Sequence, residues 1–296
     1  MKKRKFLKVI FFVLILLSCS NESPIRQGSV KLIFSDPGLN DGRPLPVWTY
    51  IPSDYNENTR ILFVMHGNGR NAKSYRDAWI DHAEKYSFLL VVPEFSREQF
   101  PKASNYNMGN MFKMDANENI ISKNSKNLWS FSLIEPIFDF VKKRTRNKSH
   151  GYFIYGHSAG SQFVHRFMFF IPESRVEKAV FANAGWYTMP DFNTEFPYGL
   201  KKTSCTLDHL KDVFSKKVIV LLGDKDTDPD HPQLRKTPQA MAQGKHRFER
   251  GHTFFKKCRD LADSSGFVFN WVLDIVPGAK HSNKQMAPAA AKVLFE

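Results

Sequence analysis

The pentapeptide GHSAG at residues 156–160 is the feature that most constrains how this chain can fold. An apolar run, Tyr152 to Tyr155, precedes it and indicates a short buried strand. Apolar residues between 163 and 171 follow it and indicate a buried helix that ends at Pro172. Strand, sharp turn and helix form a nucleophile elbow, which exposes a serine hydroxyl. The glycines around Ser158 permit such a turn because they lack a Cβ atom.

Short apolar runs alternate with helical patterns along the rest of the chain. The run at 60–65 is nearly continuous, which is typical of a strand in the middle of a parallel sheet. Strands separated by helical stretches indicate a mostly parallel, twisted sheet flanked by helices on both faces. The expected strands, of which the first two are antiparallel, are 30–34, 46–51, 60–65, 88–93, 152–155, 177–183, 217–222 and 269–276.

Ligands of such sheets collect at the carboxyl ends of the strands, and a glycine-rich turn, His66 to Gly69, follows the strand at 60–65. A serine hydrolase uses two backbone N–H groups to stabilise the developing oxyanion. One belongs to the residue after the nucleophile, here Ala159, and the other comes from the loop after an earlier strand. Asn68 is our prediction for the second N–H group, with an ordinary turn as the alternative interpretation.

An acidic loop, GDKDTDPD at residues 223–230, follows the strand at 217–222. A carboxylate that orients a catalytic histidine belongs at the end of a strand. Asp226 is favoured for this role, with Asp224 and Asp228 as alternatives. The loop does not match a calcium-binding EF-hand, because the registers tested place neither glycine at the sixth position nor an acid at the twelfth. We therefore predict no metal site.

His281 follows the last expected strand, in the sequence PGAKH at 277–281. From there it can reach back over the sheet to take a proton from Ser158. The order nucleophile, acid, histidine along the chain is the one that accompanies this kind of elbow. His157 is interpreted as a structural residue near the site, and His231 lies too close in sequence to the acid to be favoured as the base.

Taken in order, these motifs resemble the α/β-hydrolase superfamily and, within it, the secreted poly(3-hydroxybutyrate) depolymerase and feruloyl-esterase-like group. The motifs that carry the resemblance are HGNGRNA at 66–72, GHSAG at 156–160, GDKDTDP at 223–229 and PGAKH at 277–281. The resemblance implies the α/β-hydrolase fold and an ester hydrolase, but it does not imply that a polyester is the true substrate. We expect a substrate of the polyester or acylated-saccharide type and a mechanism that uses no metal or organic cofactor. The resemblance also implies Ser158 as the nucleophile, His281 as the base and Asp226 as the acid.

Two aromatic residues, Trp186 and Tyr187, follow the expected strand at 177–183. They either line the substrate pocket or pack in the core, because large aromatic side chains dominate cores as well. The polar insertions at 97–127 and 188–216 are long connections between sheet elements. Such connections often form lids or substrate walls, so we expect specificity to depend on them.

Two further functions fit the same residues. Acyl transfer does not by itself distinguish an ester from an amide, so a peptidase on the same fold is one alternative. The other is a non-catalytic surface lipoprotein that binds a glycan or a polymer. The complete set of serine, aspartate and histidine argues against this second alternative, because a protein that only binds has no need of all three.

The N-terminus has the features of an export signal. A basic start is followed by an unbroken apolar run at 9–17, far shorter than the roughly 20 residues that span a bilayer. The sequence LLSC at 16–19 resembles the lipobox of bacterial lipoproteins. This resemblance implies lipidation of Cys19 and a protein anchored to a membrane of the bacterial cell envelope. An ordinary signal peptide with an incidental cysteine is the alternative.

This interpretation divides the chain into a signal peptide at 1–18, a tether at 19–28 and one catalytic domain at 29–296. It also accounts for part of the formal charge of +14, since removal of the signal leaves 38 basic and 29 acidic residues. The densest remaining basic cluster, at 142–148, follows an expected helix, where cations oppose the helix dipole. No nucleic-acid-binding motif accompanies this cluster, so no nucleic-acid partner is predicted.

Two cysteines, Cys205 and Cys258, remain besides Cys19. An exported protein meets oxidants, so the two can form a disulfide. Two buried thiols are the alternative. Their spacing includes no CxxC pair, and a zinc site is not expected.

Overall fold

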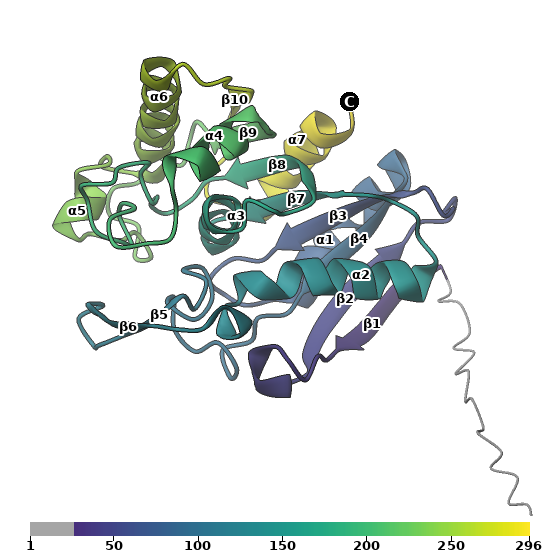
Figure 1. Cartoon of the computed structure of the whole chain (residues 1–296). Helices are drawn as coiled ribbons and strands as arrows, with labels where there is room; N and C mark the ends of the chain where they lie inside the picture. The colour runs from purple at the N-terminus through teal and green to yellow at the C-terminus, as the bar shows by residue number, and fades with distance from the viewer. Residues whose placement is uncertain (1–26) are drawn as a thin grey trace, which may run out of the picture.

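Eight strands form one sheet, and their order across it is β1 (Gly28–Phe34), β2 (Leu45–Ile51), β4 (Phe88–Pro93), β3 (Arg60–Met65), β7 (Tyr152–His157), β8 (Val176–Ala182), β9 (Lys217–Gly223) and β10 (Trp271–Val276) (Figure 1). The computed structural model describes residues 27–296. β2 pairs antiparallel with β1 and β4, and all other neighbouring strands of this sheet are parallel. The mostly parallel sheet with antiparallel opening strands is therefore confirmed.

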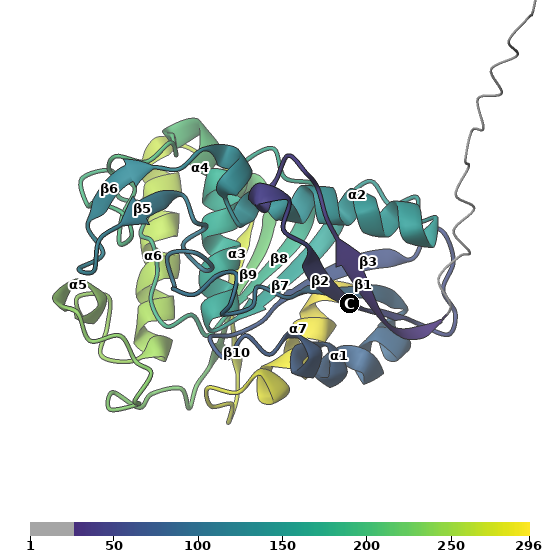
Figure 2. The same ribbon diagram turned by 90° about the horizontal axis from the view of Figure 1, so that it is seen from below.

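Helices cover both faces of the sheet (Figure 2). One face packs against α1 (Ala72–Tyr86) and α7 (Asn283–Phe295). The other packs against α2 (Ile134–Thr145), α3 (Ala159–Phe170), α4 (Leu207–Ser215) and α6 (Arg247–Ser265). The short helix α5 (Pro238–Met241) and a separate hairpin of β5 (Phe112–Met114) and β6 (Ile120–Lys123) complete the elements that bear on the site.

The central strand β3 shows why its sequence is apolar at nearly every position. Successive side chains of a strand point to opposite faces of the sheet. Leu62 and Val64 belong to the core beneath α1 and α7, whereas Ile61, Phe63 and Met65 belong to the core on the opposite face. Both faces of the strand are thus buried, as expected for a sheet covered by helices on each side.

The turn between β7 and α3 is as sharp as the sequence predicts. Ser158 has φ 58° and ψ −118°, and α3 begins at the next residue. A Cβ atom on Gly160 would lie 2.0 Å from the carbonyl oxygen of Met65, and one on Gly156 would lie 2.2 Å from the carbonyl oxygen of Gly160. Glycine at both positions is what lets α3 approach β3 and β7 so closely.

Replacing Gly160 with alanine is expected to lower the free energy of unfolding by about 3 kcal/mol, because the added methyl group meets backbone that cannot rotate away. Urea denaturation at neutral pH measures the change. Gly38→Ala is the matched control, because its Cβ would meet only the end of the Asp36 side chain, at 3.3 Å. Equal stability of the two variants would show that the close approach at Gly160 does not affect the free energy of unfolding.

The two cysteines do not form the disulfide that was one of the two predictions from the sequence. Cys205 and Cys258 are both free and both buried. Cys258 lies on α6 in the main core, whereas the Cys205 sulfur lies 3.7 Å from the backbone oxygen of Thr206, just before α4. Burial raises the pKa of Cys205 to about 12, so its thiol stays protonated and unreactive at neutral pH.

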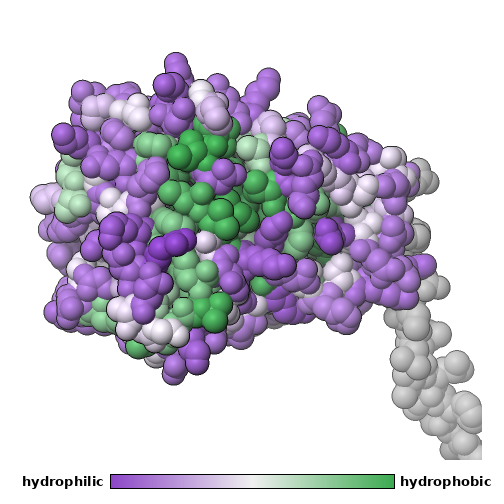
Figure 3. Space-filling model, turned by 90° about the horizontal axis from the view of Figure 1, so that it is seen from above, coloured by the Kyte–Doolittle hydropathy of each residue, from purple (hydrophilic) through white to green (hydrophobic). Residues whose placement is uncertain are grey.

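The edge strand β10 exposes apolar side chains on the surface. Val272 is 55% exposed and Ile275 is 42% exposed. Figure 3 views the molecule from above and shows apolar side chains gathered across the middle of that face. Asp274, the charged residue of this strand, lies between the two, and a charge at a sheet edge discourages pairing with another chain.

The N-terminal predictions lie outside the described residues. These are the signal peptide at 1–18, the lipidated Cys19 and all but the last two residues of the tether at 19–28. Over residues 27–296, every helix is too short or too polar to cross a bilayer.

Candidate active site

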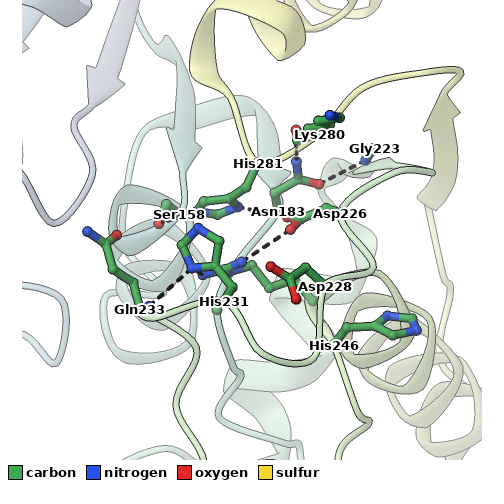
Figure 4. Close-up of polar contacts among 12 residues, drawn as sticks. Ser158, Asn183, Gly223, Asp226, Asp228, His231, Gln233, His246, Lys280 and His281 are labelled. Atoms are coloured by element: carbon green, nitrogen blue, oxygen red, sulfur yellow. Dashed lines mark hydrogen bonds and ion pairs between the residues drawn. The ribbon is translucent and has the colours of Figure 1, made fainter.

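Three side chains from distant segments meet at the carboxyl edge of the sheet (Figure 4). His281 Nε2 lies 2.9 Å from Ser158 Oγ, and His281 Nδ1 lies 2.7 Å from Asp226 Oδ2. Ser158 follows β7, Asp226 follows β9 and His281 follows β10. The structure thus brings together the three residues that the sequence singled out, each within hydrogen-bond distance of the next.

The two alternative acids have other partners, backbone N–H groups, and only Asp226 contacts His281. The Asp224 carboxylate accepts a hydrogen bond from the Gly278 N–H at 2.7 Å, which ties the loop after β9 to the loop before His281. The Asp228 carboxylate accepts from the Asp230 N–H at 2.8 Å. Asp226 is therefore the one acid of this loop whose carboxylate reaches the imidazole.

Asn183, which sequence reasoning missed, holds three strand ends together. Its Oδ1 accepts a hydrogen bond from the Gly223 N–H at 2.8 Å, and its Nδ2 donates to the Lys280 carbonyl at 3.3 Å. Asn183 has φ 46° at the end of β8, a left-handed conformation that asparagine tolerates better than most residues. An asparagine at a strand end is the sequence signal that could have marked it.

Arg247 is a second residue that the sequence did not reveal. Its Nη1 lies 3.2 Å from Asp226 Oδ1, and both side chains are only 2% exposed. Its Nη2 lies 3.0 Å from His231 Nδ1. The buried carboxylate therefore faces a protein cation on one oxygen and the His281 imidazole on the other. His231 is placed beside this ion pair, and its ring centre is 5.9 Å from that of His281.

Three histidines near the site are buried in a neutral state. Burial lowers the pKa of His66 to about 3, and it holds the pKa values of His157 and His165 well below the ordinary value of 6.5. The Nε2 atoms of His66 and His165 accept hydrogen bonds from the N–H groups of Phe95 and Thr188, which a protonated ring could not do. His157 contacts the Tyr75 hydroxyl through Nδ1 at 3.1 Å, consistent with its predicted structural role.

These histidines predict a loss of stability at mildly acidic pH. The pKa values of these histidines are lower in the folded protein than in the unfolded chain. Below pH 6.5 the unfolded chain therefore binds protons that the folded protein does not bind. Between pH 6.5 and 5 each histidine should lower the free energy of unfolding with a slope that rises from about 0.7 to about 1.4 kcal/mol per pH unit. Urea denaturation across this range measures the slope. His165→Gln should reduce the slope by one proton. Ser264→Ala, which changes an exposed residue that does not titrate in this range, should leave the slope unchanged, and equal slopes for the two variants would contradict the assignment.

A pocket of about 210 Å³ opens beside Ser158. Asn68, Ala159 and Trp186 are among the residues that line it, so Trp186 takes one of the two positions that its sequence left open. Ala159 is the first residue of α3, where a backbone N–H has no acceptor within the helix. Tyr187 takes the other position, in the core: it is fully buried, and its ring stacks on Phe254 with the ring centres 4.3 Å apart. Trp186 thus lines the pocket while it also packs in the core, whereas Tyr187 packs in the core.

Two further arginines flank the pocket. The guanidinium groups of Arg166 and Arg235 lie 4.2 and 4.8 Å, respectively, from the centre of the Trp186 ring. Arg235 also lines a second pocket, of about 410 Å³. Residues 117–120 and 194–198 line that second pocket, so both polar insertions contribute to the wall of a pocket that shares Arg235 with the pocket at Ser158.

The chain is similar to solved structures over nearly its whole length. Poly(aspartic acid) hydrolase-1 from Sphingomonas sp. KT-1 is 44% identical with a TM-score of 0.86, and the match covers 92% of this chain and 100% of that one. LpqC, a poly(3-hydroxybutyrate) depolymerase from Bordetella parapertussis, is 32% identical with a TM-score of 0.84 over 91% of this chain and 90% of that one.

More distant structures share the fold alone. An S-formylglutathione hydrolase from Agrobacterium tumefaciens is 13% identical with a TM-score of 0.53, over 93% of this chain and 96% of that one. No protein-family model and no curated protein matched the sequence. The identity to two hydrolases over nine tenths of the chain, together with the sheet order and the elbow, shows that the chain belongs to the esterase-type α/β-hydrolases.

Proposed function

We propose that the chain hydrolyses carboxylic esters through an acyl-enzyme formed on Ser158. The observation that carries this proposal is the unbroken contact from Ser158 Oγ through His281 to the buried Asp226, with distances of 2.9 and 2.7 Å. A hydroxyl so placed can lose its proton to the imidazole, while the carboxylate holds the tautomer in which Nε2 accepts.

The proposed reaction has two halves. Ser158 Oγ attacks the ester carbonyl carbon as its proton passes to His281 Nε2, and the backbone N–H groups of Asn68 and Ala159 stabilise the oxyanion. The tetrahedral intermediate collapses, and the leaving alkoxide takes the proton from His281. Water then attacks the acyl-enzyme in the same way and releases the acid together with free Ser158.

Amide bonds in an acidic polymer are a second candidate substrate. Arg235 lines the pocket that contains Ser158; its guanidinium is paired with Glu118, and a guanidinium has further N–H groups that can bind a substrate carboxylate. The solved structure with 44% identity is a poly(aspartic acid) hydrolase, whose named polymer is amide-linked and carries a carboxylate on each unit. A polyester or an acylated saccharide remains the first candidate from the sequence, and the same serine would serve either bond.

A substrate panel separates these candidates. It contains p-nitrophenyl acetate, hydroxybutyrate oligomers, acetylated and feruloylated sugars, and poly(aspartic acid). Release of hydroxybutyrate or of acyl groups from sugars identifies an ester substrate, and cleavage of poly(aspartic acid) identifies the amide-linked one. A protein that neither hydrolyses any member nor reacts with a fluorophosphonate would contradict the proposal and favour the non-catalytic, polymer-binding alternative.

We also propose that Cys19 is lipidated and tethers the domain to a membrane of a bacterial cell envelope. The support is the basic and apolar start of the chain and its LLSC sequence at 16–19. Cells that produce the full chain should incorporate labelled palmitate into it, and Cys19→Ala should remove the label. Label that persists in Cys19→Ala, or a wild-type chain that takes up none, would contradict the anchor.

A further inference from the structure

Two carboxamide side chains face each other in the pocket that contains Ser158. Asn107 comes from the first polar insertion, and Gln162 lies one turn along α3 from the serine, with its N–H 3.0 Å from the Ser158 carbonyl oxygen. Asn107 Nδ2 donates to Gln162 Oε1 at 2.7 Å. Both residues are more than nine tenths buried, so their remaining polar atoms must find partners within the pocket.

The hydrogen bond between the two side chains leaves one acceptor and one donor unused. Within residues 27–296, no hydrogen bond reaches Asn107 Oδ1 or Gln162 Nε2, and neither atom is fully shielded from solvent. Since both residues line the pocket, these two atoms face it. Rotating both carboxamides by 180° gives the same result, because one oxygen and one NH₂ group always remain.

The surrounding residues hold this pair in place. Arg166 Nη1 donates to the backbone carbonyls of Asn107 at 3.0 Å and of Gln162 at 3.1 Å, and Arg166 is fully buried. Gly185 lies opposite, where a Cβ atom would come within 2.9 Å of Gln162 Nε2. The pair is therefore preorganised, with space kept open beside its donor.

We propose that Asn107 and Gln162 recognise a secondary amide in the acyl part of the substrate, one unit from the carbonyl that Ser158 attacks. The substrate N–H donates to Asn107 Oδ1, and the substrate C=O accepts from Gln162 Nε2. Gln162 lies one helical turn from Ser158. This spacing places the substrate amide about 5–6 Å from the carbonyl that Ser158 attacks. This inference rests on the proposed function and specifies its substrate class.

An amide matches this pair and an ester does not. An ester has a carbonyl but no N–H, so in a polyester the acceptor oxygen would be left without its donor. Sites built to pair with an N–H discriminate strongly against analogues that lack it, because a buried polar atom is then left unpaired. The pair thus selects chains that contain amide groups, whichever type of bond is broken.

Two p-nitrophenyl esters that differ in a single group test this inference. N-acetylglycine and O-acetylglycolate p-nitrophenyl esters share the scissile bond and the leaving group, and one has N–H where the other has oxygen. After each rate is divided by the rate of hydroxide hydrolysis, kcat/KM should favour the amide compound by about tenfold. In Asn107→Leu/Gln162→Met, which keeps the shape and removes the polar groups, the ratio should fall to about one.

Asn58→Leu is the matched control and should keep the wild-type ratio. Asn58 is exposed and precedes β3, so it lies at the amino end of that strand, whereas the active site lies at the carboxyl ends of the strands. Equal corrected rates in the wild type would overturn the inference even if the double variant fails to fold. A double variant that loses activity on both compounds with an unchanged ratio would show that the pair is only structural. Failure of the proposed function is distinct, since neither ester would then be hydrolysed in a serine-dependent way.

Discussion

Ser158→Ala is expected to lower kcat for p-nitrophenyl acetate by about 10⁶-fold, to the level left by binding and oxyanion stabilisation alone. The loss follows from the geometry, because no other hydroxyl in the described part of the chain is hydrogen-bonded to His281 Nε2. Alanine and serine both carry a Cβ, so the strain at φ 58° is the same in the two proteins. Steady-state hydrolysis and fluorophosphonate labelling measure the effect.

The matched control for this variant is Ser264→Ala, which removes an exposed hydroxyl from α6 and should retain full activity and labelling. Thermal unfolding of Ser158→Ala should match that of the wild type, which separates a chemical loss from a folding defect. Turnover within tenfold of the wild type would contradict the assignment of Ser158 as the nucleophile. Labelling that persists at another residue would identify the group that acts instead.

The elbow and the strand ends were predictable because they are local. GHSAG lies where a strand, a turn and a helix follow one another within residues 152–170, and the continuous apolar run of β3 already implies burial on both faces. His281 could be found because it follows the last strand of the sheet. Such signals depend on the order of residues along the chain and not on the three-dimensional packing.

Contacts that form only in the folded protein could not be predicted from the sequence. Arg247 opens a helix that follows Asp226 by 21 positions, and nothing near it in the chain indicates that its guanidinium meets the acid. Whether Trp186 and Tyr187 line the pocket or pack in the core was likewise decided by packing, since adjacent aromatic residues have the same sequence signature. The three candidate aspartates after β9 share one loop, so only the position of the imidazole could separate them.

Asp226→Asn is expected to lower kcat by about 10⁴-fold and the free energy of unfolding by about 3–5 kcal/mol. The activity falls because an amide in place of the carboxylate no longer fixes the reactive tautomer of His281. The stability falls for a different reason. Arg247 is 2% exposed and would remain a buried cation without its counter-charge. Ester hydrolysis and urea denaturation measure the two losses separately.

The double variant Asp226→Asn/Arg247→Met separates these two roles of the carboxylate. Removing both charges of a buried ion pair is often close to neutral, so most of the lost stability should return while activity stays low. Recovery of activity in the double variant would mean that Asp226 serves only to neutralise Arg247. Full stability of the single variant would mean that the 3.2 Å contact contributes little, and that the arginine finds compensation elsewhere, with the His231 ring at 3.0 Å as the nearest group.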